Sequence, residues 1–178
     1  MQEQKNNEGI LTNPYLWAVI YVIAVLVANY TATMFIELPI FGFIAIGTFV
    51  FGITFTARDY VHRAGRPLIY GMILVAAILA TLMSFLLDVP IRIIIASFIA
   101  IIIAETADTE VYQRFIEDRW LTRVLKSNLV SIPLDTVLFT LIAFLGVAGM
   151  PPLEEIIFAE TLFKFIVGFL TALLRFIR

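Results

Sequence analysis

Long apolar stretches, separated by short polar or proline-bearing joints, dominate the chain from residue 15 onward. Six of them are long enough to cross about 30 Å of hydrocarbon as helices: residues 15–36, 40–57, 67–87, 91–113, 127–147 and 153–176. Proline recurs in the joints, where its fixed φ suits the first turn of a helix: Pro39, Pro67, Pro90, Pro151 and Pro152. The stretches lack the alternation of apolar and polar residues found in barrel strands. The pattern therefore predicts an all-α, polytopic membrane protein with six transmembrane helices.

Composition supports a membrane protein and excludes several classes of function. Of the 178 residues 61% are hydrophobic and 15% are charged, against roughly 25% charged in soluble domains, and the mean hydropathy is +0.99. The formal net charge of -2 gives no bulk basic field, so nucleic-acid binding is disfavoured. Cysteine is absent and His62 is the single histidine, which excludes thiolate sites and clusters of imidazoles. No cofactor is expected.

The basic residues predict the orientation of the chain. Residues 1–14 form a polar tail without the features of a cleaved signal peptide, and residues 15–178 form one six-helix domain. Arg92 stands alone on one side of the predicted spans, whereas ten of the twelve basic residues fall on the other side: Lys5, Arg58, Arg63, Arg66, Arg114, Arg119, Arg123, Lys126, Arg175 and Arg178. Because basic residues are retained on the cytoplasmic face, we expect a multi-pass protein of the bacterial inner or plasma membrane with both termini in the cytoplasm.

Ionisable residues inside the spans are the strongest functional signal. Each costs roughly 2.5 to 3.5 kcal/mol in hydrocarbon and normally faces the bundle interior or a water-filled cavity. On the fourth span, Ser97, Glu105, Asp108 and Tyr112 are spaced by multiples of three or four residues and form one stripe. The spacing predicts two carboxylates facing the interior from this helix.

Three other spans offer polar groups to the same interior. On the fifth, Asn128, Ser131 and Asp135 form a second stripe, and Pro133 between them predicts a locally broken helix that lines a cavity. The first span contributes Asn29 and Thr33, and the sixth contributes Glu160 and Lys164. We expect four helices to converge on one polar cavity.

Simpler roles exist for several of these residues. Glu160 and Lys164 can form an intrahelical ion pair, and Asn29, Thr33, Ser97 and Ser131 can hydrogen-bond between helices, which contributes about 0.6 kcal/mol on average. Arg58 and His62 fall in a predicted solvated joint, where His62 is read as a surface residue, although Arg58 could seal the inner mouth. Three carboxylates, Glu105, Asp108 and Asp135, however, outnumber Lys164, the one cation counted as available deep in the membrane, so at least one of them is assigned to function.

Four segments carry a family resemblance over almost the whole chain. They are ANYTAT (28 to 33), FTARDYVHR (55 to 63), ASFIAIIIAETADTEVYQR (96 to 114) and SNLVSIPLDTVLF (127 to 139). They resemble the queuosine precursor transporter family, also called the vitamin uptake transporter family. The resemblance implies import of 7-deazaguanine bases, such as the 7-cyano and 7-aminomethyl forms, for salvage into tRNA. It also implies a fold like that of the S components of energy-coupling-factor transporters.

The chemistry of such a base matches these residue types. A carboxylate can accept bidentately from its ring N–H and exocyclic amine, and its carbonyl needs a donor such as an amide. We expect Glu105 or Asp108 to hold the donor edge, Asn128 the carbonyl, and Asp135 a proton or the substrate amine. Asn29, Ser131 and Tyr112 complete the predicted site. The base could stack on any of four aromatic residues: Tyr30, Phe98, Tyr112 or Phe139.

Three alternatives to a secondary transporter remain open. One is a substrate-capturing subunit that needs a separate ATPase, because the chain has no GxxxxGK[ST] phosphate loop. A second is an intramembrane aspartyl enzyme built on Asp108 and Asp135, and a third is a purely structural protein. The sequence also leaves open the preferred base, the coupling ion and whether the chain forms a homodimer.

Overall fold

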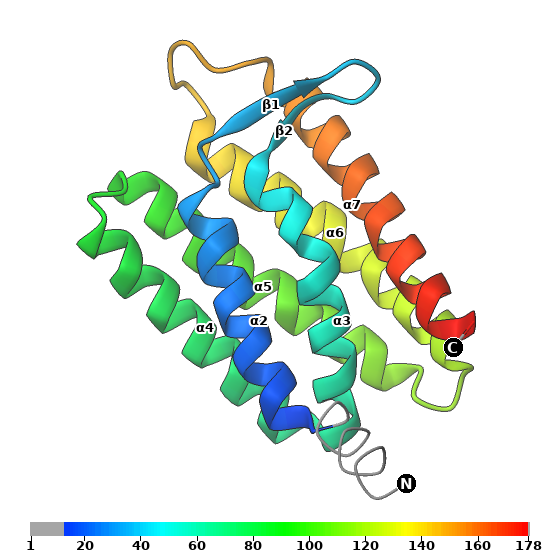
Figure 1. The fold of residues 1–178 in the computed structure, drawn as a ribbon. Helices are drawn as coiled ribbons and strands as arrows, with labels where there is room; N and C mark the ends of the chain where they lie inside the picture. Colours follow the sequence, from blue (N-terminus) through cyan, green and yellow to red (C-terminus); the bar gives the residue numbers. More distant parts are fainter. Residues whose placement is uncertain (1–12, 178) are drawn as a thin grey trace, which may run out of the picture.

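The computed structural model describes residues 13–177, with their side chains up to residue 173, and most of them are helical (Figure 1). Within this range lie six α-helices: α2 (Pro14–Tyr30), α3 (Phe51–Val61), α4 (Arg66–Leu86), α5 (Ile91–Arg114), α6 (Trp120–Phe144) and α7 (Leu153–Ile177). Every predicted span except the second overlaps one long helix. The predicted tail, which carries Lys5, lies outside the described residues except at its last two positions, and Arg178 lies outside them as well.

Prolines and one asparagine mark the starts of three helices. Pro67 and Pro90 lie where the sequence predicted, whereas Pro39, expected at a helix start, lies in a turn at residues 39–41. Pro14 and Pro67 occupy the first turns of α2 and α4, and Pro90 directly precedes α5. The side chain of Asn13 accepts a hydrogen bond from the Tyr15 amide at 2.9 Å, which satisfies one of the free donors at the start of α2. The unpaired N–H of a first turn is where proline costs least.

The second predicted span is wrong over its first half. Residues Phe35–Leu38 (β1) and Gly42–Ala45 (β2) form an antiparallel hairpin, and a 3-10 helix, η1 (Ile46–Val50), leads into α3. The prediction failed because a short apolar run fits a buried strand as well as a helix. Gly42 has a φ of +83°, a conformation that glycine adopts at no steric cost and that ends helical geometry.

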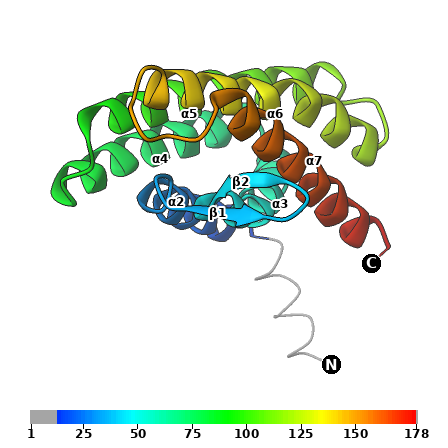
Figure 2. The same ribbon diagram turned by 90° about the horizontal axis from the view of Figure 1, so that it is seen from above.

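The helices form a closed ring when the bundle is viewed along its axis. Figure 2 shows α4, α5 and α6 in one layer and α2 and α3 in the other. Packing of α7 against α6 and α3 closes one side of the ring, and packing of α2 against α4 closes the other. The side chains in the middle of the ring are therefore enclosed by helices rather than exposed at its rim.

The two ends of the bundle differ in structure. The hairpin end carries β1, β2 and the connections α4–α5 and α6–α7 (Figure 1). The terminal end carries the start of α2, the end of α7, the α5–α6 connection and the α3–α4 connection, which contains the 3-10 turn η2 (His62–Ala64). The start of the first described helix and the end of the last thus share one face.

The helices differ in whether they meet the requirements for crossing a bilayer. By length and composition three described helices are suited to it: Arg66–Leu86, Trp120–Phe144 and the Leu153–Leu173 part of α7. Helix α2 has 17 residues, or about 26 Å, and α3 has 11 residues, or about 17 Å. The 24-residue α5 interrupts its apolar sequence with Arg92, Glu105 and Asp108. The multi-pass character is supported, while the number of six crossings stays a prediction.

Helix α6 continues through Pro133, so the predicted break in this helix is wrong.

The segment η1 packs closely against α2. A Cβ on Gly47 would lie 2.4 Å from the carbonyl oxygen of Ala28, which shows that η1 and α2 meet through their backbones. A side chain at Gly47 would push these two elements apart.

Candidate functional site

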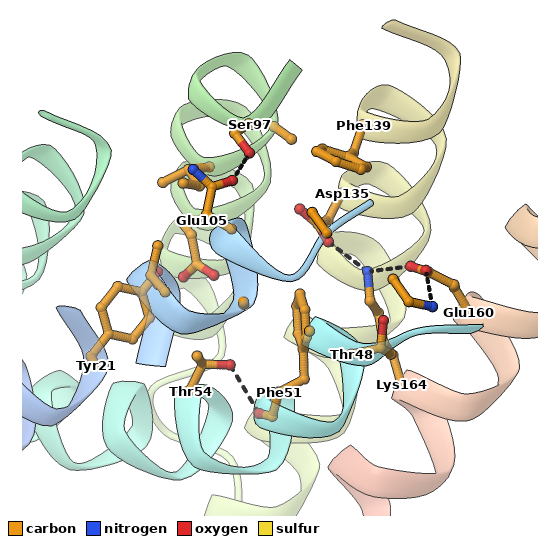
Figure 3. Close-up of a pocket in the computed structure, with 18 residues that line it drawn as sticks. Tyr21, Thr48, Phe51, Thr54, Ser97, Glu105, Asp135, Phe139, Glu160 and Lys164 are labelled. Atoms are coloured by element: carbon orange, nitrogen blue, oxygen red, sulfur yellow. Dashed lines mark hydrogen bonds and ion pairs between the residues drawn. The ribbon is translucent and has the colours of Figure 1, made fainter. Parts of the chain in front are cut away.

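A cavity of about 700 Å³, counting the part that opens to solvent, lies in the ring on the side of the hairpin. All the helices except α4 contribute to its wall, together with β2 and η1. Figure 3 shows its side chains. The lining residues that carry charge or a ring are Tyr21, Phe51, Glu105, Asp135, Phe139, Glu160 and Lys164. The rest of the wall combines small and aliphatic residues with four further polar residues, Asn29, Thr48, Thr54 and Ser97.

One polar side of the cavity is an ion cluster between α6 and α7. The ammonium of Lys164 donates to Asp135 Oδ2 at 2.9 Å and to the Thr136 hydroxyl at 3.1 Å. It also pairs with Glu160 Oε2 at 3.3 Å and lies 4.2 Å from the centroid of the Phe51 ring. The predicted intrahelical pair of Glu160 and Lys164 is confirmed, but Asp135 joins it across the helices (Figure 3).

Glu160 also ties the hairpin to this cluster. Its Oε1 accepts a hydrogen bond from the backbone amide of Ala45 at 3.1 Å. Ala45 is the last residue of β2, so the bond satisfies a backbone donor at the edge of the hairpin. The same carboxylate therefore contacts the hairpin with one oxygen and Lys164 with the other.

Glu105 faces the cavity from α5. Its side chain is 15% exposed, and Figure 3 shows it on the side of the cavity near Tyr21, away from Lys164. Behind it, Arg58 Nη1 donates to the two carboxylate oxygens at 3.2 and 3.3 Å. Glu105 and Asp135, which is 21% exposed, thus present carboxylates from two helices to one space.

Asp108, by contrast, lies outside the cavity wall and has no exposed surface. Its Oδ1 is 3.0 Å from Arg58 Nη2 and accepts from the Ser131 hydroxyl at 2.9 Å. Arg58 Nη2 also donates to the Asn128 side-chain oxygen at 2.8 Å. We call these four residues with Glu105 the arginine network. Asn128 and Asp108 are directed to Arg58, and Ser131 is directed to Asp108, rather than to the main cavity.

A second, much smaller cavity lies beside the main one, with about 10 Å³ in which the centre of a water-sized molecule fits. Phe51, Glu105 and Asp135 belong to the walls of both cavities, and Arg58 and Ser131 line only the second. The second cavity therefore lies between the main cavity and the arginine network. Arg58 is 2% exposed and occupies its wall together with the side chains of α5 and α6.

His62 and Arg58 correct two expectations from the sequence. His62 is buried, with its ring stacked on Tyr112 at 4.0 Å between centroids and its Nε2 3.4 Å from Asp108 Oδ2. Reading it as a surface histidine is wrong. Arg58 is a second buried cation, so counting Lys164 as the one available cation is also wrong. Their spacing of four residues places both on one face of a helix, which was the available signal.

A smaller polar group connects three helices on the α2 side of the main cavity. The Asn29 amide donates to the Ser84 hydroxyl at 3.1 Å, and Ser97 donates to the Asn29 oxygen (Figure 3). The interhelical hydrogen bonding expected of Asn29 and Ser97 is confirmed. Both residues also line the cavity, so the structural role does not remove them from the site.

The aromatic residues are sorted by their surroundings. Of the four considered for stacking, Phe139 alone lines the cavity, and Tyr112 lies against His62. Tyr30 and Phe98 have exposed side chains on the outside of the bundle. Phe51 and Tyr21 line the cavity and were not singled out from the sequence, because aromatic residues occur throughout the spans.

The described residues hold no group of three or more His, Asp or Glu side chains arranged to bind a metal ion. The cavity instead offers acceptors on two opposed sides, one ammonium donor and aromatic surface between them. Such a set can bind a flat organic molecule that carries several N–H donors.

Comparison with known proteins adds a family relationship. A family model described as "Putative vitamin uptake transporter" matches residues 45–177, which is more than half of the chain. Neither the curated proteins nor the solved structures gave a match. The matched range begins at the end of β2 and includes every charged residue of the cavity.

Proposed function

This chain belongs to the vitamin uptake transporter family, and from that premise we propose that it is a secondary transporter that imports 7-deazaguanine bases for tRNA queuosine salvage. The family and the apolar helices support a multi-pass protein that moves a small molecule through a lipid bilayer. The deazaguanine is the finer part of the proposal, and it rests on the chemistry of the cavity.

One observation carries the proposal: Glu105 and Asp135 face the same cavity from α5 and α6. The ring N–H and the exocyclic amine of a deazaguanine lie side by side, and one carboxylate can accept from both. Glu105 takes this role in preference to Asp108, because Asp108 has no exposed surface. Asp135 is positioned to accept a proton or the aminomethyl group of the substrate.

The remaining contacts follow from which residues line the cavity. Asn128 is not among them, and its oxygen accepts from Arg58. The role of donor to the substrate carbonyl, predicted for Asn128, is therefore assigned to Lys164, which lines the cavity and would exchange one of its three present partners for the carbonyl. Phe139 provides the stacking surface, and Asn29 contacts the edge of the ring from α2.

The topology belongs to the same proposal. We place the terminal end in the cytoplasm and the hairpin end outside, with six crossings in one domain of residues 15–178. The joints at the terminal end carry Arg63, Arg114 and Arg119, whereas Arg92 lies near the hairpin end. The positive-inside rule then gives the orientation. A cavity on the hairpin side would receive its substrate from outside the cell.

Binding to the purified protein tests the substrate class. Thermal unfolding in detergent would be followed with guanine, adenine, 7-cyano-7-deazaguanine and 7-aminomethyl-7-deazaguanine. A ligand present at 100 times its dissociation constant adds about 2.7 kcal/mol. We expect stabilisation by both deazaguanines, at least about tenfold weaker binding in Glu105→Gln and Asp135→Asn, and none of this loss in the exposed control Glu154→Gln. Equal binding by all four proteins would contradict the assignment.

Reconstitution of the chain alone in liposomes tests the transport mode. Uptake of a labelled deazaguanine without any added ATPase supports a secondary transporter. Binding without uptake, restored by a partner ATPase, would instead support the substrate-capturing alternative. Binding by neither deazaguanine would contradict the proposed substrate and leave the family relationship untouched.

A further inference from the structure

The arginine network lies between the main cavity and the terminal end. The main cavity and the second cavity share Phe51, Glu105 and Asp135 in their walls, and Arg58 lies in the wall of the second. Beyond Arg58 lie Asp108 and His62, and both are buried. A solute that leaves the cavity toward the terminal end must pass this group of side chains.

Arg58 is held from two directions by groups of different exposure. On the cavity side, Nη1 donates to both oxygens of Glu105, whose side chain is partly exposed. On the far side, Nη2 is within 3.0 Å of Asp108 Oδ1 and donates to Asn128. The guanidinium thus bridges α5 and α6 from its own helix, α3, and joins three members of the ring.

We propose that Arg58 is the inner gate of the transport path and that Glu105 couples this gate to occupation of the cavity. The inference rests on the proposed transport function, and it adds residues and a mechanism to it. Arg58 does not contact the substrate itself. It blocks the path and affects the substrate only through its contact with Glu105.

The coupling follows from competition for one carboxylate. The two Glu105 oxygens that face Arg58 are the same oxygens that a ligand with two adjacent N–H donors would use. A bound ligand therefore weakens one of the two carboxylate contacts that hold Arg58. Because a ligand shifts a conformational equilibrium by its difference in affinity between the two states, occupation of the cavity favours the state in which Arg58 has moved from Glu105.

The charges explain why the gate can reclose. Asp108, Asn128 and Ser131 stay behind Arg58 whether or not the cavity is filled, and no cavity ligand can reach the fully buried Asp108. These groups keep the guanidinium in the protein interior, where an unpaired charge is costly. Release of the ligand returns the Glu105 oxygens to Arg58.

The absence of cysteine from the chain allows a ligand-free test by thiol labelling. Ala104 lines the second cavity and Ala100 lines the main cavity, so Ala104→Cys reports on the path behind Glu105 and Ala100→Cys is its matched control. Each would be exposed to a charged methanethiosulfonate reagent from the terminal end in oriented vesicles. The gate variant is the double substitution Arg58→Gln and Asp108→Asn, which removes one buried charge of each sign.

The expected result is at least about tenfold faster labelling of Ala104→Cys from the terminal end in the gate variant than in the otherwise native protein. Arg58→Lys, which keeps the positive charge, should label at a rate near that of the native background. Unchanged labelling in the gate variant would overturn the gate. If the double variant does not fold, Glu105→Gln provides the second test, because it removes only the cavity-side contact and should raise the labelling rate about threefold or more; no rise would count against the coupling.

A ligand measurement separates this inference from the proposed function. With 7-aminomethyl-7-deazaguanine as the probe, competition predicts about tenfold tighter binding in the gate variant, because Glu105 no longer faces Arg58. Uptake into liposomes should fall at the same time, and a role limited to stability would not give this opposite change. Weaker or equal binding in the gate variant would overturn the coupling. Failure of the native protein to bind the probe would sink the substrate proposal, while the ligand-free labelling would still decide the gate.

Discussion

The main cavity and the arginine network use the same chemistry with opposite results. Each brings two acidic side chains to one cation. Lys164 in the cavity pairs with Asp135 of α6 and Glu160 of α7, and Arg58 in the network pairs with Glu105 and Asp108, which both belong to α5. In the cavity, Asp135 keeps part of its surface exposed, whereas Asp108 in the network keeps none. The difference teaches that pairing with a buried cation does not by itself decide whether a carboxylate is available to a ligand: Glu105 and Asp135 are both paired and keep exposed surface, and Asp108 keeps none.

The geometry of the two cations accounts for this difference. An ammonium is a compact donor that can be approached from several directions, while a guanidinium presents a planar fork that is occupied on both edges here. Arg58 engages Glu105, Asp108 and Asn128 at once. The network therefore resembles a filled core, and the cavity resembles a binding site with one polar wall already formed.

The largest effect that would test this comparison is on stability. Asp108→Asn removes a fully buried partner of Arg58, so we expect a loss of about 3 to 5 kcal/mol in the free energy of unfolding. Asp135→Asn should lose only about 1 kcal/mol, because Lys164 keeps Glu160 and solvent reaches the site. Unfolding by denaturing detergent in mixed micelles measures both. Equal losses would show that the two regions do not differ as described.

A second, smaller effect on stability is expected when the hydroxyl group that hydrogen-bonds in each region, the arginine network or the Lys164 cluster, is removed. Ser131→Ala removes the donor to a buried carboxylate and should cost about 1.5 to 3 kcal/mol. Thr136→Val removes one of three polar partners of Lys164 and should cost about 1 kcal/mol. The same unfolding measurement applies to both variants. A larger loss of stability for Thr136→Val than for Ser131→Ala would contradict the description of the arginine network as the more deeply buried of the two regions.

Aromatic substitutions sharpen the comparison on the side of ligand binding. Phe139→Leu removes a ring from the cavity wall, and base stacking of about 0.5 to 1.5 kcal/mol corresponds to weakening of about two- to tenfold. Phe98→Leu changes a ring on the outside of the same bundle and should leave affinity unchanged. Isothermal titration with 7-aminomethyl-7-deazaguanine distinguishes them. Similar losses in both variants would indicate an effect transmitted through the fold.

The smallest expected effect on stability comes from removing the charge of an exposed acidic residue. Glu154→Gln removes an acidic residue from the first turn of α7, where it is exposed, and should change the free energy of unfolding by less than about 0.5 kcal/mol. Glu160 lies on the same helix but is buried, so Glu160→Gln is the natural comparison. A large effect at Glu154 would mean that total acidity, rather than enclosure, stabilises this helix.

Hydropathy and proline positions predicted most of the helices but not the hairpin. Helices α4, α5 and α7 agree with their predicted spans to within about a residue at each end, because a long apolar run bounded by proline has few other solutions in a membrane. The run that includes Gly42 failed, since its strands and its helix are equally apolar. One contact that favours the hairpin comes from Glu160, which is remote in sequence and accepts a hydrogen bond from the strand amide of Ala45.

Helical periodicity predicted which carboxylates face the interior of the bundle. It did not predict which of them line the main cavity and which are buried in the arginine network. Glu105 and Asp108 lie on one stripe of α5, as expected, yet Arg58 lies between their environments and separates the cavity from the network. That separation depends on where α3 begins, which the hairpin sets. The pairing of Asp135 with Lys164 across two helices likewise depends on the ring closure by α7, and no local sequence pattern encodes it.

The hydrogen bond from the Ala45 amide to Glu160 gives the molecule an internal reporter. Such an amide exchanges with deuterium only after its bond to the carboxylate opens. Any occupant that draws Lys164 away from Glu160 alters the electrostatic environment of that carboxylate. The exchange rate at a single peptide group of the hairpin is therefore tied to events at the ammonium, and mass spectrometry of the peptide that contains it can follow them without a covalent probe.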